Sequence, residues 1–174
     1  MPQEGTASIV VMGVQGVGKS TIGRLLAERL AVPYVEGDEL HPPRNIELMA
    51  AGRPLQDADR EPWLHAVGGT LARHHASGVV VACSALKRRY RDVLRGHAPE
   101  LYVVEPWGPI ELVARRIAAR THEYMPPSLL RSQFDTLEPL GEDERGIRVS
   151  IDQSPAEIID EVAADLRERS GAVS

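Results

Sequence analysis

Short, unbroken apolar runs recur along the chain, and stretches with helical spacing separate them. The runs are SIVVMG (8–13), PYVEG (33–37), GVVVACSA (78–85), LYVVEP (101–106) and IRVSID (147–152). A run of this length without polar alternation is typical of a strand buried on both faces of a sheet. Between the runs, apolar residues return every three or four positions, as in IGRLLAERL (22–30), which predicts a helix.

Further helices are predicted at 45–52, 57–78, 86–96, 110–120 and 154–169. The last has clear start signals, with Ser154 as N-cap, Pro155 at the first helical position and Glu157 three residues after the cap. Gly68-Gly69, inside the 57–78 stretch, either weakens that helix or marks a close packing contact.

Five strands alternating with helices predict an α/β protein, in which helices cover both faces of a parallel sheet. The 174 residues suit one domain, 1–174, and no repeat, low-complexity segment or linker divides them. One polar, proline-bearing segment, 121–146, breaks the rhythm of strands and helices.

Composition narrows the class of protein. No apolar run reaches the roughly 20 residues of a membrane span, and MPQEGTASIV lacks the basic and apolar parts of a signal peptide. The single cysteine, Cys83, cannot form an internal disulfide, so we expect a cytoplasmic protein. A formal net charge of −5 argues against broad binding to nucleic acid or anionic membrane. An anionic ligand would therefore need local cations.

The first strand leads into GVQGVGKS (13–20), which matches the phosphate-binding pattern G-x-x-x-x-G-K-[ST]. Its glycines let backbone N–H groups curl round phosphate oxygens, Lys19 brings a positive charge to the β- and γ-phosphates, and the Ser20 hydroxyl can ligate Mg²⁺. The alternative is a glycine-rich turn with an incidental lysine, but a buried strand before and a helix after favour a nucleotide site. The residues predicted to bind ATP here are Gly13, Gly16, Val17, Gly18, Lys19, Ser20 and Thr21.

Charged residues follow the second and third strands, at the sheet edge where ligands bind in open α/β folds. Asp38 is the candidate to orient an acceptor hydroxyl and take its proton. An anionic substrate also needs cations, for which the candidates are His41, Arg44 and Lys87.

These residues have plainer interpretations too. Glu39 is expected to be solvated, and Glu36 either supports Mg²⁺ or caps a turn. His41, before two prolines, either binds substrate or holds the turn together. Basic runs such as KRRYRDVLR (87–95) are usually solvated helix faces.

The segment from about 116 to 140 is predicted to be a lid. Arg115, Arg116 and Arg120 lead into it, and phosphoryl transfer favours water exclusion and extra positive charge on the moving group. The alternative is a helix with exposed arginines followed by a surface excursion.

Four stretches together resemble the gluconate kinases, which are P-loop small-molecule kinases related to shikimate and adenylate kinases. They are MGVQGVGKST, EGDELHPPRNIELMAAGRPLQDADREPWL, CSALKRRYRDVLR and LLRSQFDTLEPL. The resemblance runs from about residue 8 to the final helix. The first stretch is the generic P-loop, whereas the last three are specific to the gluconate kinases.

The resemblance implies ATP- and Mg²⁺-dependent phosphorylation of D-gluconate at its 6-hydroxyl, strand order 2-3-1-4-5, a mobile lid and a homodimer. Carried over by position, Lys19 and Ser20 would hold phosphates and Mg²⁺, and Asp38 would face the acceptor hydroxyl. The implied residues around the sugar acid are His41, Arg44, Lys87 and Arg91, and the implied lid arginines are Arg116 and Arg120.

The chain departs from the family pattern at two positions. Glu36 stands where members often have aspartate, which leaves its water-mediated role toward Mg²⁺ open. Tyr124 replaces a frequent phenylalanine after His122, and the ring is kept.

Two rival functions remain. One is a kinase for another sugar acid or hydroxy acid. The other is a nucleotide-dependent switch without a small acceptor, although the guanine-specific N/T-K-x-D pattern is absent from the sequence.

Overall fold

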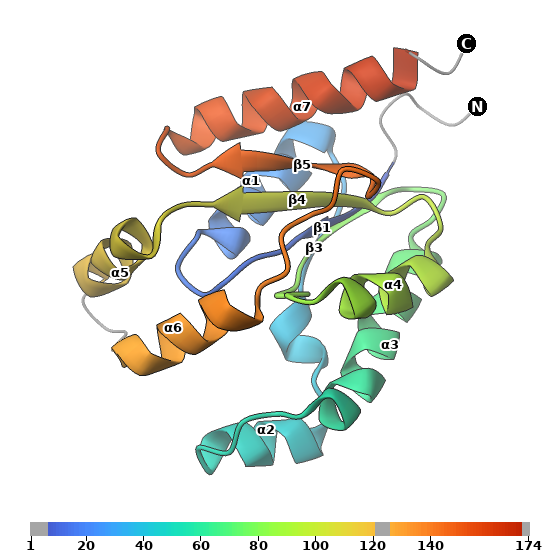
Figure 1. Cartoon of the computed structure of the whole chain (residues 1–174). Coiled ribbons are helices and arrows are strands. Elements are labelled where there is room, and N and C mark those ends of the chain that lie inside the picture. Colours follow the sequence, from blue (N-terminus) through green and yellow to red (C-terminus); the bar gives the residue numbers. More distant parts are fainter. Residues whose placement is uncertain (1–6, 121–125, 172–174) are drawn as a thin grey trace.

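The computed structural model describes residues 7–120 and 126–171. Its centre is a five-stranded parallel sheet in the order β2-β3-β1-β4-β5 (Figure 1). The strands are β1 (Ser8–Val11), β2 (Tyr34–Glu36), β3 (Val79–Ala82), β4 (Tyr102–Trp107) and β5 (Gly146–Ser150). The predicted α/β class and the strand order are confirmed, and each strand lies inside or within one residue of its predicted run.

The α-helices are α1 (Lys19–Leu30), α2 (Pro43–Ala50), α3 (Asp57–Arg73), α4 (Arg88–His97), α5 (Ile110–Ala119), α6 (Pro127–Thr136) and α7 (Pro155–Gly171). A 3-10 helix, η1, spans Gly37–Leu40. No helix in the described ranges is long and apolar enough to cross a membrane.

Two helical segments differ from the sequence prediction. The segment 121–146 contains α6, which begins with Pro127 in the first turn, where a missing N–H costs nothing, and buries Leu130. The predicted helix 57–78 ends earlier, at Arg73. At α7 the predicted cap is confirmed, because Ser154 Oγ accepts the Glu157 N–H at 3.2 Å and Glu157 Oε1 accepts the Ser154 N–H at 3.3 Å.

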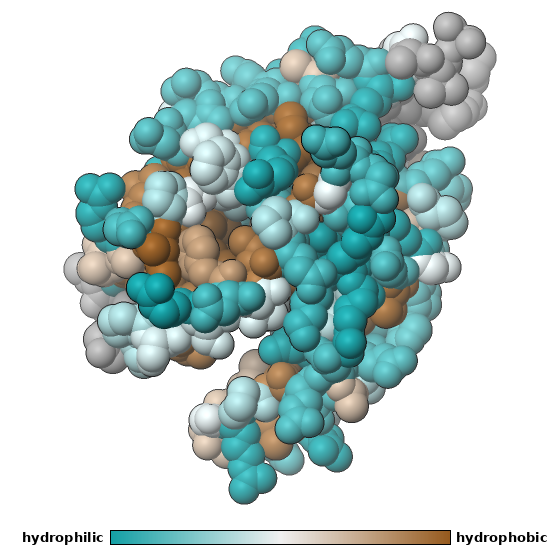
Figure 2. Space-filling view, viewed as in Figure 1, coloured by the Kyte–Doolittle hydropathy of each residue, from teal (hydrophilic) through white to brown (hydrophobic). Residues whose placement is uncertain are grey.

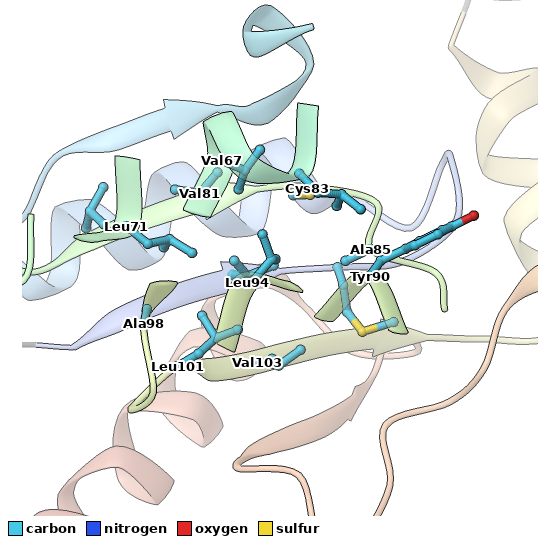
Figure 3. Close-up of a cluster of buried hydrophobic side chains, with 14 of the residues drawn as sticks. Val67, Leu71, Val81, Cys83, Ala85, Tyr90, Leu94, Ala98, Leu101 and Val103 are labelled. Carbon is cyan, nitrogen blue, oxygen red and sulfur yellow. The ribbon is translucent and has the colours of Figure 1, made fainter. Parts of the chain in front are cut away.

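Each face of the sheet is covered by a pair of helices. Val10, Val81 and Val103 point toward α3 and α4, in a cluster that contains Trp63 (Figure 3). Alternate residues of the same strands point the other way and pack against α1 and α7. This alternation explains why the strands read as continuous apolar runs.

Gly68 lets α3 and α4 approach closely. A Cβ at this position would lie 2.4 Å from the ring of His97, so the close-packing interpretation of Gly68-Gly69 is confirmed for Gly68. A third apolar cluster joins the loop after β1 to α5 and α6. In the view of Figure 2, apolar residues gather in a hollow beside these two helices, and most of the remaining surface in this view is hydrophilic.

Candidate active site

The loop from β1 to α1, residues 13–20, has the backbone geometry of a phosphate cradle. Gly13, Gly16 and Gly18 have φ values of 134°, 90° and 95°, a region that side chains beyond glycine rarely adopt. Gly16 also lies against α5, where a Cβ would approach the Ile117 side chain to 2.5 Å. The loop ends at the N-terminus of α1, whose free N–H groups and dipole favour an anion.

Lys19 folds back over this loop. Its Nζ donates to Gly13 O at 2.8 Å and Val14 O at 3.1 Å. Burial lowers the pKa of Lys19, and the nearby charges of Asp38 and Glu36 oppose that shift. The ammonium therefore lies among the acids that follow β2.

Ser20, Glu36 and Tyr34 form a short hydrogen-bonded chain beside the cradle. Ser20 Oγ donates to Glu36 Oε2 at 2.8 Å, and the Tyr34 hydroxyl donates to the same oxygen at 2.6 Å. A hydroxyl and a carboxylate are hard oxygen groups that suit Mg²⁺. Among the described residues no three metal-ligating side chains gather, so Mg²⁺ here would also need phosphate oxygens and water, as it does in kinase sites.

Asp38 lies next to this chain, on η1. The turn is pressed against β3, because a Cβ on Gly37 would be 2.3 Å from Ala82 O, and Trp63 Nε1 donates to Gly37 O at 2.8 Å. The Asp38 side chain is exposed and accepts no hydrogen bond from the described residues. Burial lowers the pKa of Lys19 and of His41, and the negative charge of Asp38 opposes both shifts, so this exposed carboxylate interacts with both side chains.

His41 is held in a defined orientation. Its ring stacks on Trp63 with centroids 4.2 Å apart, and Asn45 Nδ2 lies 3.1 Å from Nδ1. The same Asn45 nitrogen donates to Asp59 O at 2.8 Å, so it is the amide nitrogen and His41 Nδ1 is the acceptor. The neutral ring then carries its proton on Nε2. Burial lowers the pKa of His41, which keeps the ring neutral.

A cavity of about 400 Å³ lies between the starts of α3 and α4 and the end of α6. Its lining includes Lys87, Asp57 and Tyr90, and the Asp57 carboxylate is the centre of a group of hydrogen bonds. Asp57 accepts hydrogen bonds from Tyr90, Arg89 and Lys87, the last at 3.4 Å. In Figure 3 the Tyr90 hydroxyl points away from the apolar cluster. A larger cavity, about 520 Å³, lies at the amino end of β5, on the sheet edge opposite the cradle.

Arg60 also lines the 400 Å³ cavity, and sequence reasoning gave it no role. Its Nε is buried and has no hydrogen-bond partner among the described residues, and its guanidinium lies 5.7 Å from the Tyr90 ring centroid. An unpartnered buried donor at a cavity is costly unless a ligand satisfies it. In the sequence, the only signal for Arg60 is its place in DADREPWL, within one of the stretches that resemble the gluconate kinases.

Arg91, which the family resemblance implies as a substrate residue, is turned into the interior in this structure, and its substrate role stays a prediction. It is fully buried, and its Nε and Nη2 donate to the two Glu144 oxygens at 2.8 and 2.9 Å. Its Nη1 donates to Ala85 O at 3.0 Å. Arg91 therefore supports the loop that carries Lys87, since helical phase turns it toward the interior of the protein.

Arg44 is brought near the site but remains exposed. Its Nη2 lies 3.5 Å from Asp59 Oδ1, at the edge between α2 and α3. Among the residues predicted to bind the substrate, Lys87 lies 3.4 Å from Asp57 at the 400 Å³ cavity, and His41 is held as a neutral ring against Trp63.

The described residues include only part of the predicted lid, 116–120 and 126–140. Arg116 donates to Ile151 O and Arg120 is exposed at the end of α5, while His122 and Tyr124 lie outside the described residues. Gln133 of α6 accepts the backbone N–H of Gln15 at 2.7 Å, which ties this region to the cradle.

Three further side chains lie outside these groups. Cys83 is buried in the first apolar cluster, and burial raises the pKa of its thiol to about 12. Glu39 is exposed, as expected. Trp107 is 40% exposed and lies under Arg148, so it does not join the core.

Comparison with known proteins agrees with this geometry. A model of the shikimate kinase family matches residues 15–167. The gluconokinase of Gluconobacter oxydans (strain 621H) is 45% identical over 156 residues, which cover 88% of each chain. The crystal structure of a gluconokinase from Sinorhizobium meliloti 1021 is 47% identical, with a TM-score of 0.89 over 96% of this chain and 95% of that one.

The shikimate kinase of Aquifex aeolicus, at 18% identity and a TM-score of 0.64, shares the fold. The motifs, the strand order and these matches converge on one conclusion: the chain belongs to the gluconokinases, within the shikimate kinase family.

Proposed function

We propose that this protein transfers the γ-phosphoryl group of ATP to the 6-hydroxyl of D-gluconate, giving 6-phospho-D-gluconate and ADP. The observation that carries the proposal is the position of Asp38. Its exposed carboxylate follows β2 on η1, and its charge acts on Lys19 of the phosphate cradle and on His41, which supports the proposal. The gluconokinase relatives support the choice of acceptor.

Each group has a role in this reaction. The cradle N–H groups and Lys19 bind and orient the phosphates, and Asp38 orients the 6-hydroxyl and takes its proton as the new P–O bond forms. Positioning and electrostatics supply most of the catalysis in such transfers. Arg116 and Arg120 are proposed to add positive charge over the nucleotide.

Gluconate is an anion, so its carboxylate needs cations away from the reacting end. Lys87, Arg60 and His41 are proposed to bind the carboxylate and hydroxyls, and Arg44 is proposed to contribute at the rim. The unpartnered Arg60 Nε supports this arrangement.

Mg²⁺ is proposed to work with ATP. Ser20 and Glu36 would hold it, directly or through water, and when bound it withdraws negative charge from the phosphates. The hydrogen bond between these two side chains supports their joint role.

A coupled assay of ADP release across a panel of sugar acids and hydroxy acids, each with MgATP, tests the function. We expect strong stimulation by D-gluconate and little by D-glucose, which lacks the carboxylate. Stimulation by a different acid but not by gluconate would favour the first rival, a related kinase. No acceptor dependence at all would favour the nucleotide switch.

We also propose that the chain acts as one domain over 1–174, with a lid at about 116–140. We further propose that it forms a homodimer and works in the cytoplasm without nucleic acid or membrane partners. The family resemblance supports the lid and the dimer, and the net charge of −5 supports the absence of polyanion partners. Light scattering tests the dimer, which should have twice the 19.0 kDa mass of the chain.

A further inference from the structure

Tyr34 lies beside the phosphate cradle without belonging to any of its sequence motifs. Its hydroxyl donates to Glu36 Oε2 at 2.6 Å, and Ser20 Oγ donates to the same oxygen at 2.8 Å. One carboxylate oxygen therefore receives two hydrogen bonds. Glu36 Oε1 accepts none from the described residues, so it is available to a water molecule or a cation.

The Tyr34 ring is itself fixed from α1. A Cβ on Gly23 would lie 2.7 Å from its Cε1, and the Arg24 guanidinium lies 4.6 Å from the ring centroid. These contacts fix the ring against the helix that follows the cradle. The hydroxyl is thereby directed at Glu36, two residues along the same strand.

The direction of the hydrogen bonds matters for a cation. Because Ser20 gives its only hydroxyl hydrogen to Glu36, its oxygen lone pairs remain available for a metal ion. Tyr34 is the donor in its own hydrogen bond to Glu36, because an ionised carboxylate can only accept and a phenol carries one hydroxyl hydrogen.

Glutamate needs such support more than aspartate would. It has one more rotatable bond, so fixing it in one conformation costs more side-chain entropy. The Tyr34 hydroxyl offsets that cost by holding the carboxylate against Ser20.

We propose that Tyr34 is a positioning residue of the phosphate site, whose hydroxyl fixes Glu36 in the conformation that serves Mg²⁺ beside Ser20. The proposal rests on the proposed function only in that the site binds a Mg²⁺–nucleotide. It does not depend on which acceptor is phosphorylated.

Tyr34→Phe tests the proposal, because it removes the hydroxyl and keeps the ring that packs on α1. Tyr102→Phe is the matched control, since it also removes a 2.6 Å hydrogen bond from a tyrosine to a carboxylate, that of Asp165. Asp165 lies on α7, which packs against α1 and β5. Calorimetry of ADP binding at a series of Mg²⁺ concentrations, without gluconate, gives the half-saturating Mg²⁺ concentration directly.

We expect Tyr34→Phe to raise that concentration about tenfold, the lower end of losses seen when a group that orients a metal ligand is removed. ADP affinity without Mg²⁺ should stay unchanged, and so should the Mg²⁺ response of Tyr102→Phe. An unchanged Mg²⁺ response in Tyr34→Phe, or a loss of ADP affinity with and without Mg²⁺ alike, would overturn the proposal.

A second set of variants separates positioning from a general structural role. In a Glu36→Gln background, Tyr34→Phe should change the half-saturating Mg²⁺ concentration no further, because the carboxylate to be positioned is gone. An equal change in both backgrounds would show that Tyr34 acts independently of Glu36, against the proposal. Gluconate is absent from all of these measurements. The Mg²⁺ responses in the two backgrounds therefore test the role of Tyr34 even if the protein does not phosphorylate gluconate.

Discussion

At the scale of single residues, Asp38 has the most direct role in the proposed chemistry. Asp38→Asn should lower kcat about 100-fold or more, the scale of losing a positioned proton acceptor, with a small change in the KM for ATP. Steady-state kinetics with saturating gluconate measures this. Glu39→Gln, one position along and exposed, is the control and should retain normal kcat. A near-normal rate for Asp38→Asn would remove Asp38 from the catalytic role.

Lys87 should act on the acceptor and not on the nucleotide. Lys87→Ala should raise the KM for gluconate about tenfold or more, because a hydrogen bond to a charged group contributes about 1.5 to 3 kcal/mol. The KM for ATP should change little. Arg29→Ala removes a remote ion pair with Asp160 and should leave both constants unchanged. If Lys87→Ala instead weakened ATP binding, Lys87 would belong to the nucleotide site.

His41 should make stability depend on pH in a defined direction. Burial lowers its pKa below 6.5, and Asp38 only partly opposes the shift. The folded chain therefore binds this proton less tightly than the unfolded chain, so the contribution of His41 is complete above pH 6.5 and is lost as the pH falls below it.

Urea unfolding of the protein and of His41→Gln, on either side of pH 6.5, checks this pH dependence. The advantage of the natural protein over the variant should shrink at acid pH. If the protein and His41→Gln differed by the same free energy of unfolding at every pH, His41 would not be the source of the pH dependence. His75→Gln, at an exposed position, is the control and should differ from the protein by a constant amount.

The roles of the site residues stay predictions, but their places in the fold followed from sequence where the strand ends determine position. Asp38, His41 and Lys87 follow predicted strands, and the structure places them on one edge of the sheet. The burial of Arg91 was not predictable, because sequence shows that a basic residue follows β3 but not which way the helix turns it. Its partner, Glu144, is 53 positions away, beyond the reach of local pattern.

At the scale of elements, the buried ion pair of Arg91 and Glu144 joins α4 to the loop before β5. Burial alone would raise the pKa of Glu144, but hydrogen bonds from Arg91, Gly141 N–H and Arg95 lower it to about 2. The carboxylate thus stays ionised at neutral pH inside the protein. The same guanidinium bonds to Ala85 O, at a residue with a positive φ of 40° that turns the chain toward Lys87.

Arg91→Met should lower the free energy of unfolding by about 3 to 5 kcal/mol, since it leaves an uncompensated buried charge. The double variant Arg91→Met/Glu144→Leu should recover part of that loss. Urea unfolding of the set measures both. A stable Arg91→Met variant with a raised gluconate KM would instead restore the substrate-binding role predicted from sequence.

Helix α6 shows why one element was missed. Its short stretch lies between prolines, and it buries only Leu130 fully. A weak apolar pattern beside Pro126 and Pro127 is also typical of an irregular loop. What makes it a helix is packing on α5 and the Gln133 contact with the cradle, both of which involve residues outside the segment.

At the scale of the whole molecule, the fold was predictable because few arrangements satisfy alternating buried strands and helices. The strand order came from family resemblance, and the structure confirms it. Contacts between distant segments were not predictable, so the roles proposed for Arg60 and Tyr34 could be inferred only from the structure. Arg60 lies over the ring of Tyr90, and Tyr34 meets Ser20 of α1 only through the shared oxygen of Glu36; sequence spacing indicates neither meeting.

In the proposed acceptor site, the carboxylate of Asp57, which binds Lys87, Arg89 and Tyr90, would also determine how a charged ligand enters. A small anion such as chloride or phosphate meets cations that are already neutralised, so it gains little there. A sugar acid can displace part of this pairing because its carboxylate and its row of hydroxyls arrive together, the hydroxyls donating to the oxygens that the cations leave. The sugar acid would then replace Asp57 as the partner of these cations. Selectivity against the simple anions of a cell would therefore come from the carboxylate of Asp57 and not from the cations themselves.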